Sequence, residues 1–144
     1  MASATALYTP HVLGLATSLA QWPWDDSLTF QGEARSVTCG SKVAVGLQLA
    51  CNGMIERVGL RVHACAIGQA CAAIFAAAAT GLNTAAIVTG EQALTLWLSG
   101  DASLPDWPGL SQIAAARDYP ARHGAILLAW KAAVAVLPSD RIPR

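Results

Sequence analysis

The sequence has 144 residues, of which 54% are hydrophobic and 12% are charged. This composition predicts one compact domain spanning residues 1–144, with enough apolar material for a core. Nine basic and nine acidic residues leave no net charge, and they are scattered along the chain. Nucleic acid is therefore not expected as a partner, because binding the phosphate backbone requires a concentrated basic surface.

Neither a secretory signal nor a membrane span is expected. The first twenty residues contain no Lys or Arg and include Thr9, Pro10 and His11, whereas a signal peptide needs a basic region and then a continuous apolar one. Residues 64–90 are uncharged, but polar residues and glycines interrupt them and much of the rest is alanine. We expect a cytoplasmic protein whose four cysteines are free thiols.

The first predicted element is a helix over residues 6–19, with Pro10 tolerated in its first turn. The run of residues 22–26, WPWDD, ends it. A strand is expected over residues 28–38, and the segment Cys39-Gly40-Ser41 then forms a tight connection that glycine permits.

A β-hairpin is the clearest local signal. Apolar residues alternate on both sides of Asn52-Gly53, a pair that favours a two-residue type I′ turn. Such a turn predicts three cross-strand pairs on one buried face, namely Leu47 with Val58, Val45 with Leu60, and Val43 with Val62.

The second half of the chain reads as helical. An alanine-rich helix follows Cys65 through residue 80, with Gly81 and Asn83 as its C-terminal stop. Further helices are expected over residues 91–99, 110–116 and 121–137, with a loop over 104–109. Strands followed by helices predict an α+β fold, in which helices pack on one face of a three-stranded antiparallel sheet.

Cys39 and Cys65 are expected to meet at one end of this sheet, because the third strand ends beside the start of the second. A thiol at a helix N-terminus lies at the positive end of the helix dipole, which favours the thiolate that binds metals. The alternative is that both are small buried apolar residues, which is the commoner role of isolated cysteines. No catalytic motif is found, so an enzyme is not expected.

Three segments resemble the U-type iron-sulfur cluster assembly scaffold family, which comprises SufU, IscU and the N-terminal domain of NifU. They are residues 38–41 (TCGS), 63–72 (HACAIGQACA) and 120–132 (PARHGAILLAWKA). The first is similar to the family's ligand loop, the second to its first helix after the sheet, and the third to its last helix, in the SufU branch. The resemblance covers nearly the whole chain and implies a SufE/NifU-like fold.

In that family, three cysteines and one aspartate hold zinc or a nascent cluster, as the resemblance implies. Here Cys39 and Cys65 match two of these positions, whereas Ser41 stands at the aspartate position and Ala125 at the third cysteine. Serine is a poor zinc ligand and alanine is none. Gly124 also replaces the family's lysine, which weakens the case for sulfur transfer.

Three other residues are candidate substitute ligands. His123 lies two residues before Ala125, His63 lies two before Cys65, and Cys71 lies in the second turn of the same helix. We rank His123 above Cys71, which is rotated by roughly 120° from Cys65 on the helix. For each residue, a role without metal is the alternative.

The sequence thus leads to three functional hypotheses. The first is a scaffold-like protein that binds Fe, Zn or a labile [2Fe-2S] cluster through Cys39 and Cys65, with His123 and Ser41 as further candidates. The second is a pseudo-scaffold that contacts the cluster-assembly or cysteine desulfurase machinery without binding metal. The third is a zinc-dependent sulfur acceptor. The expected partners are a cysteine desulfurase and iron-sulfur acceptor proteins.

Overall fold

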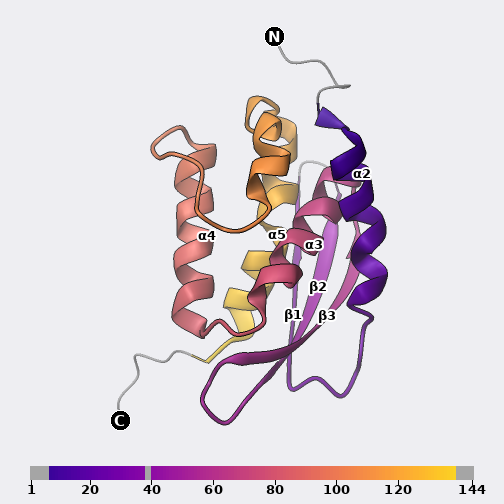
Figure 1. Ribbon diagram of the computed structural model, residues 1–144, viewed down its shortest axis with the longest axis vertical. Coiled ribbons are helices and arrows are strands. Elements are labelled where there is room, and N and C mark those ends of the chain that lie inside the picture. Colours follow the sequence, from indigo (N-terminus) through magenta and orange to yellow (C-terminus); the bar gives the residue numbers. More distant parts are fainter. Residues whose placement is uncertain (1–6, 38–39, 139–144) are drawn as a thin grey trace.

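The structure is a computed structural model that describes residues 7–37 and 40–138 (Figure 1). In the described part, the elements follow the order α2 (Pro10–Thr17), η1 (Ser18–Gln21), β1 (Phe30–Arg35), β2 (Lys42–Leu49), β3 (Ile55–His63), α3 (Ala66–Ala79), α4 (Thr84–Leu98), η2 (Leu110–Asp118) and α5 (Pro120–Val136), with η denoting a 3₁₀-helix.

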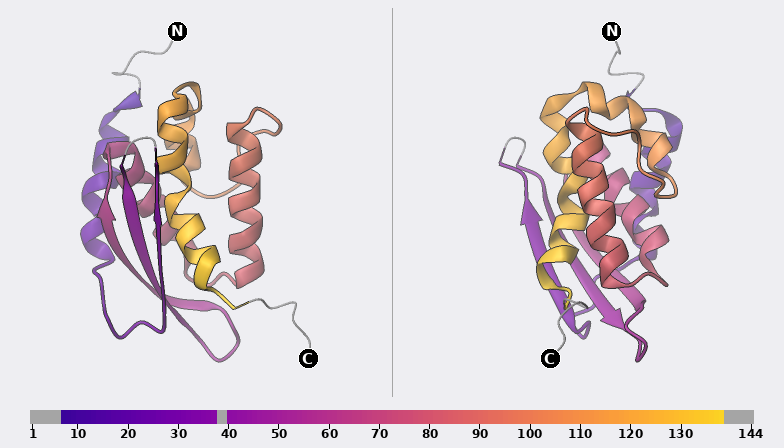
Figure 2. Two further views of the ribbon diagram at one scale, coloured as in Figure 1. Left: turned by 180° about the vertical axis from the view of Figure 1, so that it is seen from behind. Right: turned by 90° about the vertical axis from the view of Figure 1, so that its left-hand side faces the viewer.

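The three strands form an antiparallel sheet in the order β1-β2-β3. The helices lie on one side of it, with α5 against β1 and β2, α3 against β3, and α2 against α3 (Figure 2). Val43, Val45 and Leu47 of the central strand face this layer and are fully buried. The predicted α+β class, with helices on one face of a three-stranded antiparallel sheet, is confirmed.

The first helix is shorter than predicted and begins at a cap. The Thr9 hydroxyl accepts a hydrogen bond from the Val12 amide at 3.2 Å, and Pro10 occupies the first helical position. Proline suits this position because its missing N–H would have no partner inside the helix.

The β2–β3 hairpin has the predicted register but a different turn. All three predicted pairs form, yet no residue other than glycine has a positive φ in the described part of the chain, which rules out a type I′ turn at Asn52. The loop instead spans residues 51–53, and the Ala50 amide donates to the Met54 carbonyl at 2.8 Å. A register irregularity at Gln48 and Leu49 adds one residue on β3 and restores the predicted pairing.

Helix α4 begins seven residues earlier than predicted. The Asn83 side chain caps it by accepting from the Ala86 amide at 2.9 Å, so Asn83 starts this helix rather than ending the previous one. Gly90, the residue directly before the predicted start at residue 91, lies inside α4. A Cβ at this position would come within 3.1 Å of the Trp107 ring, so glycine allows close packing there.

Helix α3 and an aromatic cluster form the centre of the core. Phe75 stacks on Trp107 with ring centroids 5.9 Å apart, and Trp130 meets both rings edge-on at 5.4 and 5.3 Å. The Trp107 indole donates to the Ile74 carbonyl at 3.0 Å. In the described ranges, no helix has both the length and the apolar character needed to cross a membrane.

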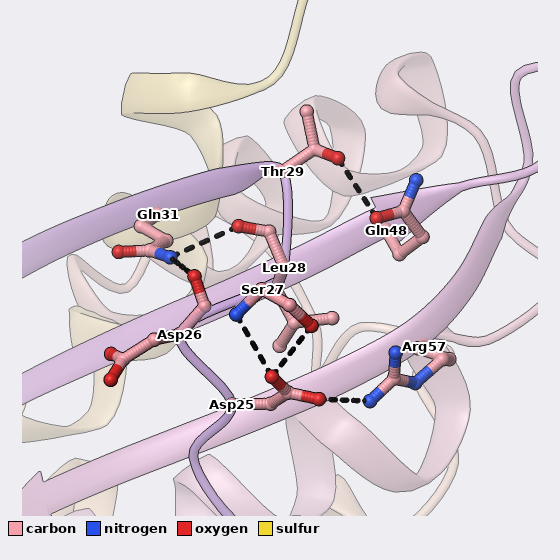
Figure 3. A network of polar contacts seen from close by, with 8 residues as sticks. All are labelled: Asp25, Asp26, Ser27, Leu28, Thr29, Gln31, Gln48 and Arg57. Atoms are coloured by element: carbon pink, nitrogen blue, oxygen red, sulfur yellow. Dashed lines mark hydrogen bonds and ion pairs between the residues drawn. The ribbon is translucent and has the colours of Figure 1, made fainter.

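The side of the sheet away from the helices is partly covered by the segment between η1 and β1, here called the strap (residues 22–29). A Cβ on either Gly46 or Gly59 would lie 2.8 Å from the Leu28 side chain, so these glycines let Leu28 settle on the sheet. Asp25 fixes the strap by accepting from Ser27 and pairing with Arg57 of β3 at 2.6 Å (Figure 3).

Candidate metal centre

Three parts of the chain meet at one end of the sheet. Lys42, the first residue of β2, pairs with Arg35 at the end of β1 and with His63 at the end of β3. Helices α3 and α5 also begin at this end, as Figure 1 shows. The β1–β2 connection, the β3–α3 junction and the first turn of α5 are therefore neighbours.

Cys65 lies at the β3–α3 junction as the N-cap residue of α3. Its backbone is extended (φ −64°, ψ 169°), and its side chain makes no capping hydrogen bond. The junction is held instead by the Gln69 side chain, which donates to the Ala64 carbonyl at 3.0 Å. Cys65 is partly exposed and lies beside the N-terminus of a fourteen-residue helix, where the helix dipole favours a thiolate.

The β1–β2 connection carries two of the sequence candidates. Cys39 lies outside the described residues. Ser41 is 3% exposed, and its carbonyl accepts from the Ser36 amide at 2.8 Å. Gly40 has a φ of 72° and donates its amide to the Ser36 carbonyl at 3.1 Å. These two backbone bonds close the connection and bury Ser41 within it.

Ala125 marks where α5 meets α3. A Cβ built on Gly68 would lie 3.4 Å from the Cβ of Ala125 and 2.7 Å from that of Ala64. Position 125 is 1% exposed and therefore lies against the first turn of the helix that Cys65 caps.

His123 is positioned by a bond to the backbone. Its Nε2 lies 2.7 Å from the Arg117 carbonyl oxygen. Because a carbonyl can only accept, Nε2 donates a proton in this contact and is not available to a metal. Any metal bound by His123 in this arrangement would therefore be bound through Nδ1.

The other two candidates lie elsewhere. His63 is exposed on the side of the sheet away from the helices, beside Lys42. Cys71 is 1% exposed in the core. Burial raises the pKa of the Cys71 thiol, and the electrostatic interaction with Cys65 acts in the same direction. In the described part of the chain, no three His, Cys, Asp or Glu side chains form a cluster that could hold a metal.

The comparisons with known proteins agree on the architecture. A nitrogen-fixing NifU-like protein (N-terminal) from Brucella abortus superposes with a TM-score of 0.80 at 24% identity, over 90% of this chain and 91% of that one. A putative iron-sulfur cluster assembly scaffold protein for the SUF system from Fervidobacterium islandicum superposes with a TM-score of 0.82 at 18% identity, over 92% and 97%. The chain has the fold of the U-type scaffold proteins. The sequence matches no family model and no curated protein.

The resemblance to the U-type scaffolds is thus confirmed at the level of the fold, and the assignment of metal ligands stays a prediction. Sequence reasoning missed one contact near this end, in which the Arg122 Nε donates to the Tyr8 hydroxyl at 3.3 Å. This bond ties α5 to the start of the first helix. The proximity of Tyr8 to Arg122 has no local sequence signal, because the residues are 114 positions apart.

Proposed function

We propose that this protein is a divergent iron-sulfur cluster scaffold-like protein that holds Fe, Zn or a labile [2Fe-2S] cluster as cargo through Cys39 and Cys65. The observation that carries the proposal is the Cys65 thiol, partly exposed and unused in capping, at the N-terminus of α3. The shared U-type scaffold fold supports it. A cytoplasmic, non-catalytic role is part of the proposal.

The candidate ligands are too few for a permanent structural metal, which favours an ion or cluster that is bound temporarily and passed on. Structural zinc sites are closed by four protein ligands. In this proposal Cys39 and Cys65 supply two thiolates, and His123 of α5, with its Nε2 bonded to the Arg117 carbonyl, is the candidate third donor. Ser41 could add only a weakly ligating hydroxyl. A site with two or three good ligands leaves positions open for exchange with water or with a partner's ligand.

Anaerobic reconstitution tests this proposal. Protein purified under reducing conditions is incubated with iron and sulfide, and the thiolate-to-iron absorption and the metal content are measured. Cys39→Ser and Cys65→Ser are expected to abolish the signal. Cys51→Ser is the matched control, because Cys51 is exposed in the β2–β3 hairpin at the opposite end of the sheet. Absence of bound metal or cluster under every reducing condition rejects the proposal.

One observation favours the second candidate, a pseudo-scaffold that works by protein contact alone. At the third cysteine position, Ala125 is buried and offers no donor atom. This hypothesis predicts that a cysteine desulfurase is captured equally well by the wild type and by a variant lacking both Cys39 and Cys65. Strict dependence of capture on these thiols would exclude it.

The third hypothesis, a zinc-dependent sulfur acceptor, requires a thiol that a partner can reach, and Cys65 is partly exposed. After incubation with a cysteine desulfurase and cysteine, a persulfide on Cys39 or Cys65 would appear as a mass increase of one sulfur atom. Unmodified thiols in a zinc-loaded sample would reject this role and leave the scaffold proposal untouched.

A further inference from the structure

A row of basic side chains crosses the exposed side of the sheet. Arg35, Lys42 and His63 occupy one rung, with Lys42 of the central strand directly between its two partners. Residues directly opposite on neighbouring strands point to the same side. This side faces away from the helices, because Val43, the next residue of β2, faces the core. We call Arg35, Lys42 and His63 the basic row.

A second cation lies on the adjoining rung. Arg61 is two residues before His63 and so points to the same side, where its guanidinium lies 4.3 Å from the centroid of the Trp24 ring. A cation held over an aromatic face keeps its charge. Three permanent cations and one histidine therefore share one end of this surface.

The repulsion among these cations lowers the stability of the sheet when no partner is bound. Like charges directly opposite each other on neighbouring strands destabilise a sheet. Nearby compensation is weak, since Glu33 is 3.9 Å from Lys42 and both side chains are substantially exposed. Arg35 and His63 have no side-chain hydrogen bond or ion pair among residues 7–37 and 40–138. The sheet thus carries a local excess of positive charge that Glu33 offsets only in part.

Among the described residues, the basic row is also largely exposed. The strap lies over the other half of this side, where Leu28 contacts Gly46 and Gly59. Arg35, Arg61 and His63 are exposed. The row stands at the end of the sheet where α3 begins, and His63 is two residues from Cys65.

We propose that the basic row and Arg61 form a docking surface for an acidic segment of a partner protein. A segment with several carboxylates in an extended conformation matches a flat surface about 10 Å across three strands. Glu33 within the surface and the balanced charge of the whole chain disfavour a nucleic acid, whose phosphates demand cations over a longer track. A partner bound here would lie beside the β3–α3 junction. The inference goes beyond the proposed function and does not require Cys65 to bind metal.

The test uses the full chain and a fluorescent peptide that carries a run of glutamates, with binding followed by fluorescence anisotropy at low ionic strength. The wild type should bind with an affinity that falls as salt is added. Arg35→Gln combined with Lys42→Gln should weaken binding by roughly tenfold. The matched control pair is Lys42→Gln against Lys131→Gln, because each removes one lysine charge and Lys131 is exposed on α5.

Three results would overturn the proposal. The first is no binding by the wild type, and the second is an equal loss for Lys131→Gln and Lys42→Gln, which would mean that only net charge matters. The third is tighter binding of an oligonucleotide of equal charge, which would assign the surface to nucleic acid. Reconstitution of the double variant with iron and sulfide separates this test from the metal proposal, because its metal content should equal that of the wild type.

Discussion

Ala125 of α5 lies against Gly68 of α3, so close that a Cβ on Gly68 would come within 3.4 Å of the Cβ of Ala125. This contact brings the second turn of α5 against the first turn of α3, which Cys65 precedes. It also places a methyl group where the U-type scaffolds, as the resemblance implies, have a ligating thiol. On this resemblance, Ala125 stands at the third-ligand position and offers no donor atom.

Placing a thiol at position 125 tests the proposed metal site directly. Ala125→Cys should raise the affinity for Zn by roughly tenfold or more, because it adds a third thiolate to Cys39 and Cys65. Competition with a chromophoric chelator measures the affinity. Ala125→Ser is the control, since it has a similar size and a poor ligand atom. Equal affinities of the two variants would mean that position 125 does not face the bound metal.

The contact between β1 and α5 should be intolerant of any side chain at Gly32. A Cβ there would clash with the Ala132 carbonyl oxygen and lie 2.8 Å from the Val136 side chain. Gly32→Ala should lower the free energy of unfolding by about 1–3 kcal/mol, as measured by urea denaturation.

The same substitution at Gly14 provides the control. No atom lies within 4 Å of a Cβ at this exposed position in α2, so Gly14→Ala should stabilise the protein by about 0.5–1 kcal/mol. A neutral effect of Gly32→Ala would contradict the close approach of α5 to β1.

The Asp25 network in Figure 3 predicts a stability that depends on acid pH. Hydrogen bonds from Ser27, and after them the bond and charge of Arg57, hold the pKa of Asp25 well below its ordinary value. Because the pKa is lower in the folded protein, this stabilisation is complete above the ordinary Asp pKa of about 4 and is lost as the pH falls below it.

Melting temperatures of the wild type and Asp25→Asn, recorded from neutral to acid pH, check this prediction. The variant should melt lower at neutral pH, and the difference should shrink as the pH falls below about 4. Asp106→Asn, at an exposed loop carboxylate, should show no such convergence. A difference that stays constant with pH would exclude an ionic role for Asp25.

The three described cysteines should differ in reactivity. Cys51 is exposed, Cys65 is partly exposed and Cys71 is buried, and the raised pKa of Cys71 disfavours its reactive thiolate. Brief alkylation of the native protein, followed by peptide mass spectrometry, should label Cys51 first, Cys65 next and Cys71 only after unfolding. Early labelling of Cys71 would show that α3 opens readily at this position.

The sequence predicts secondary structure and strand register well where a short residue pattern determines them. Alternating apolar residues specify the register of the β2–β3 hairpin, because a slip by one residue would expose the Val43, Val45 and Leu47 face. The turn type was wrong because a three-residue loop with a bulge gives the same register as a two-residue turn. The pattern alone does not distinguish these two solutions.

Elements that depend on distant contacts were harder to predict. The place of Gly90 inside α4 depends on Trp107, which is remote in sequence. Asn83 was misread for a local reason, because an asparagine between two helices can end the first or cap the second. Part of the basic row was predictable from the sequence, because strand alternation and the hairpin register place Lys42 opposite His63. The hydrogen bond of His123 could not be predicted in this way, because its partner is a backbone carbonyl of η2 and the position of η2 depends on the tertiary fold.

The strap constrains the order in which this chain can fold. Leu28 can settle only on a surface made by Gly46 and Gly59, and that surface exists only once the β2–β3 hairpin has formed. The strap can therefore take its place only after residues that follow it in the chain have paired. During synthesis, the strap would stay unattached until the hairpin has emerged, and before it packs, both glycines would leave a strip of sheet backbone open to water.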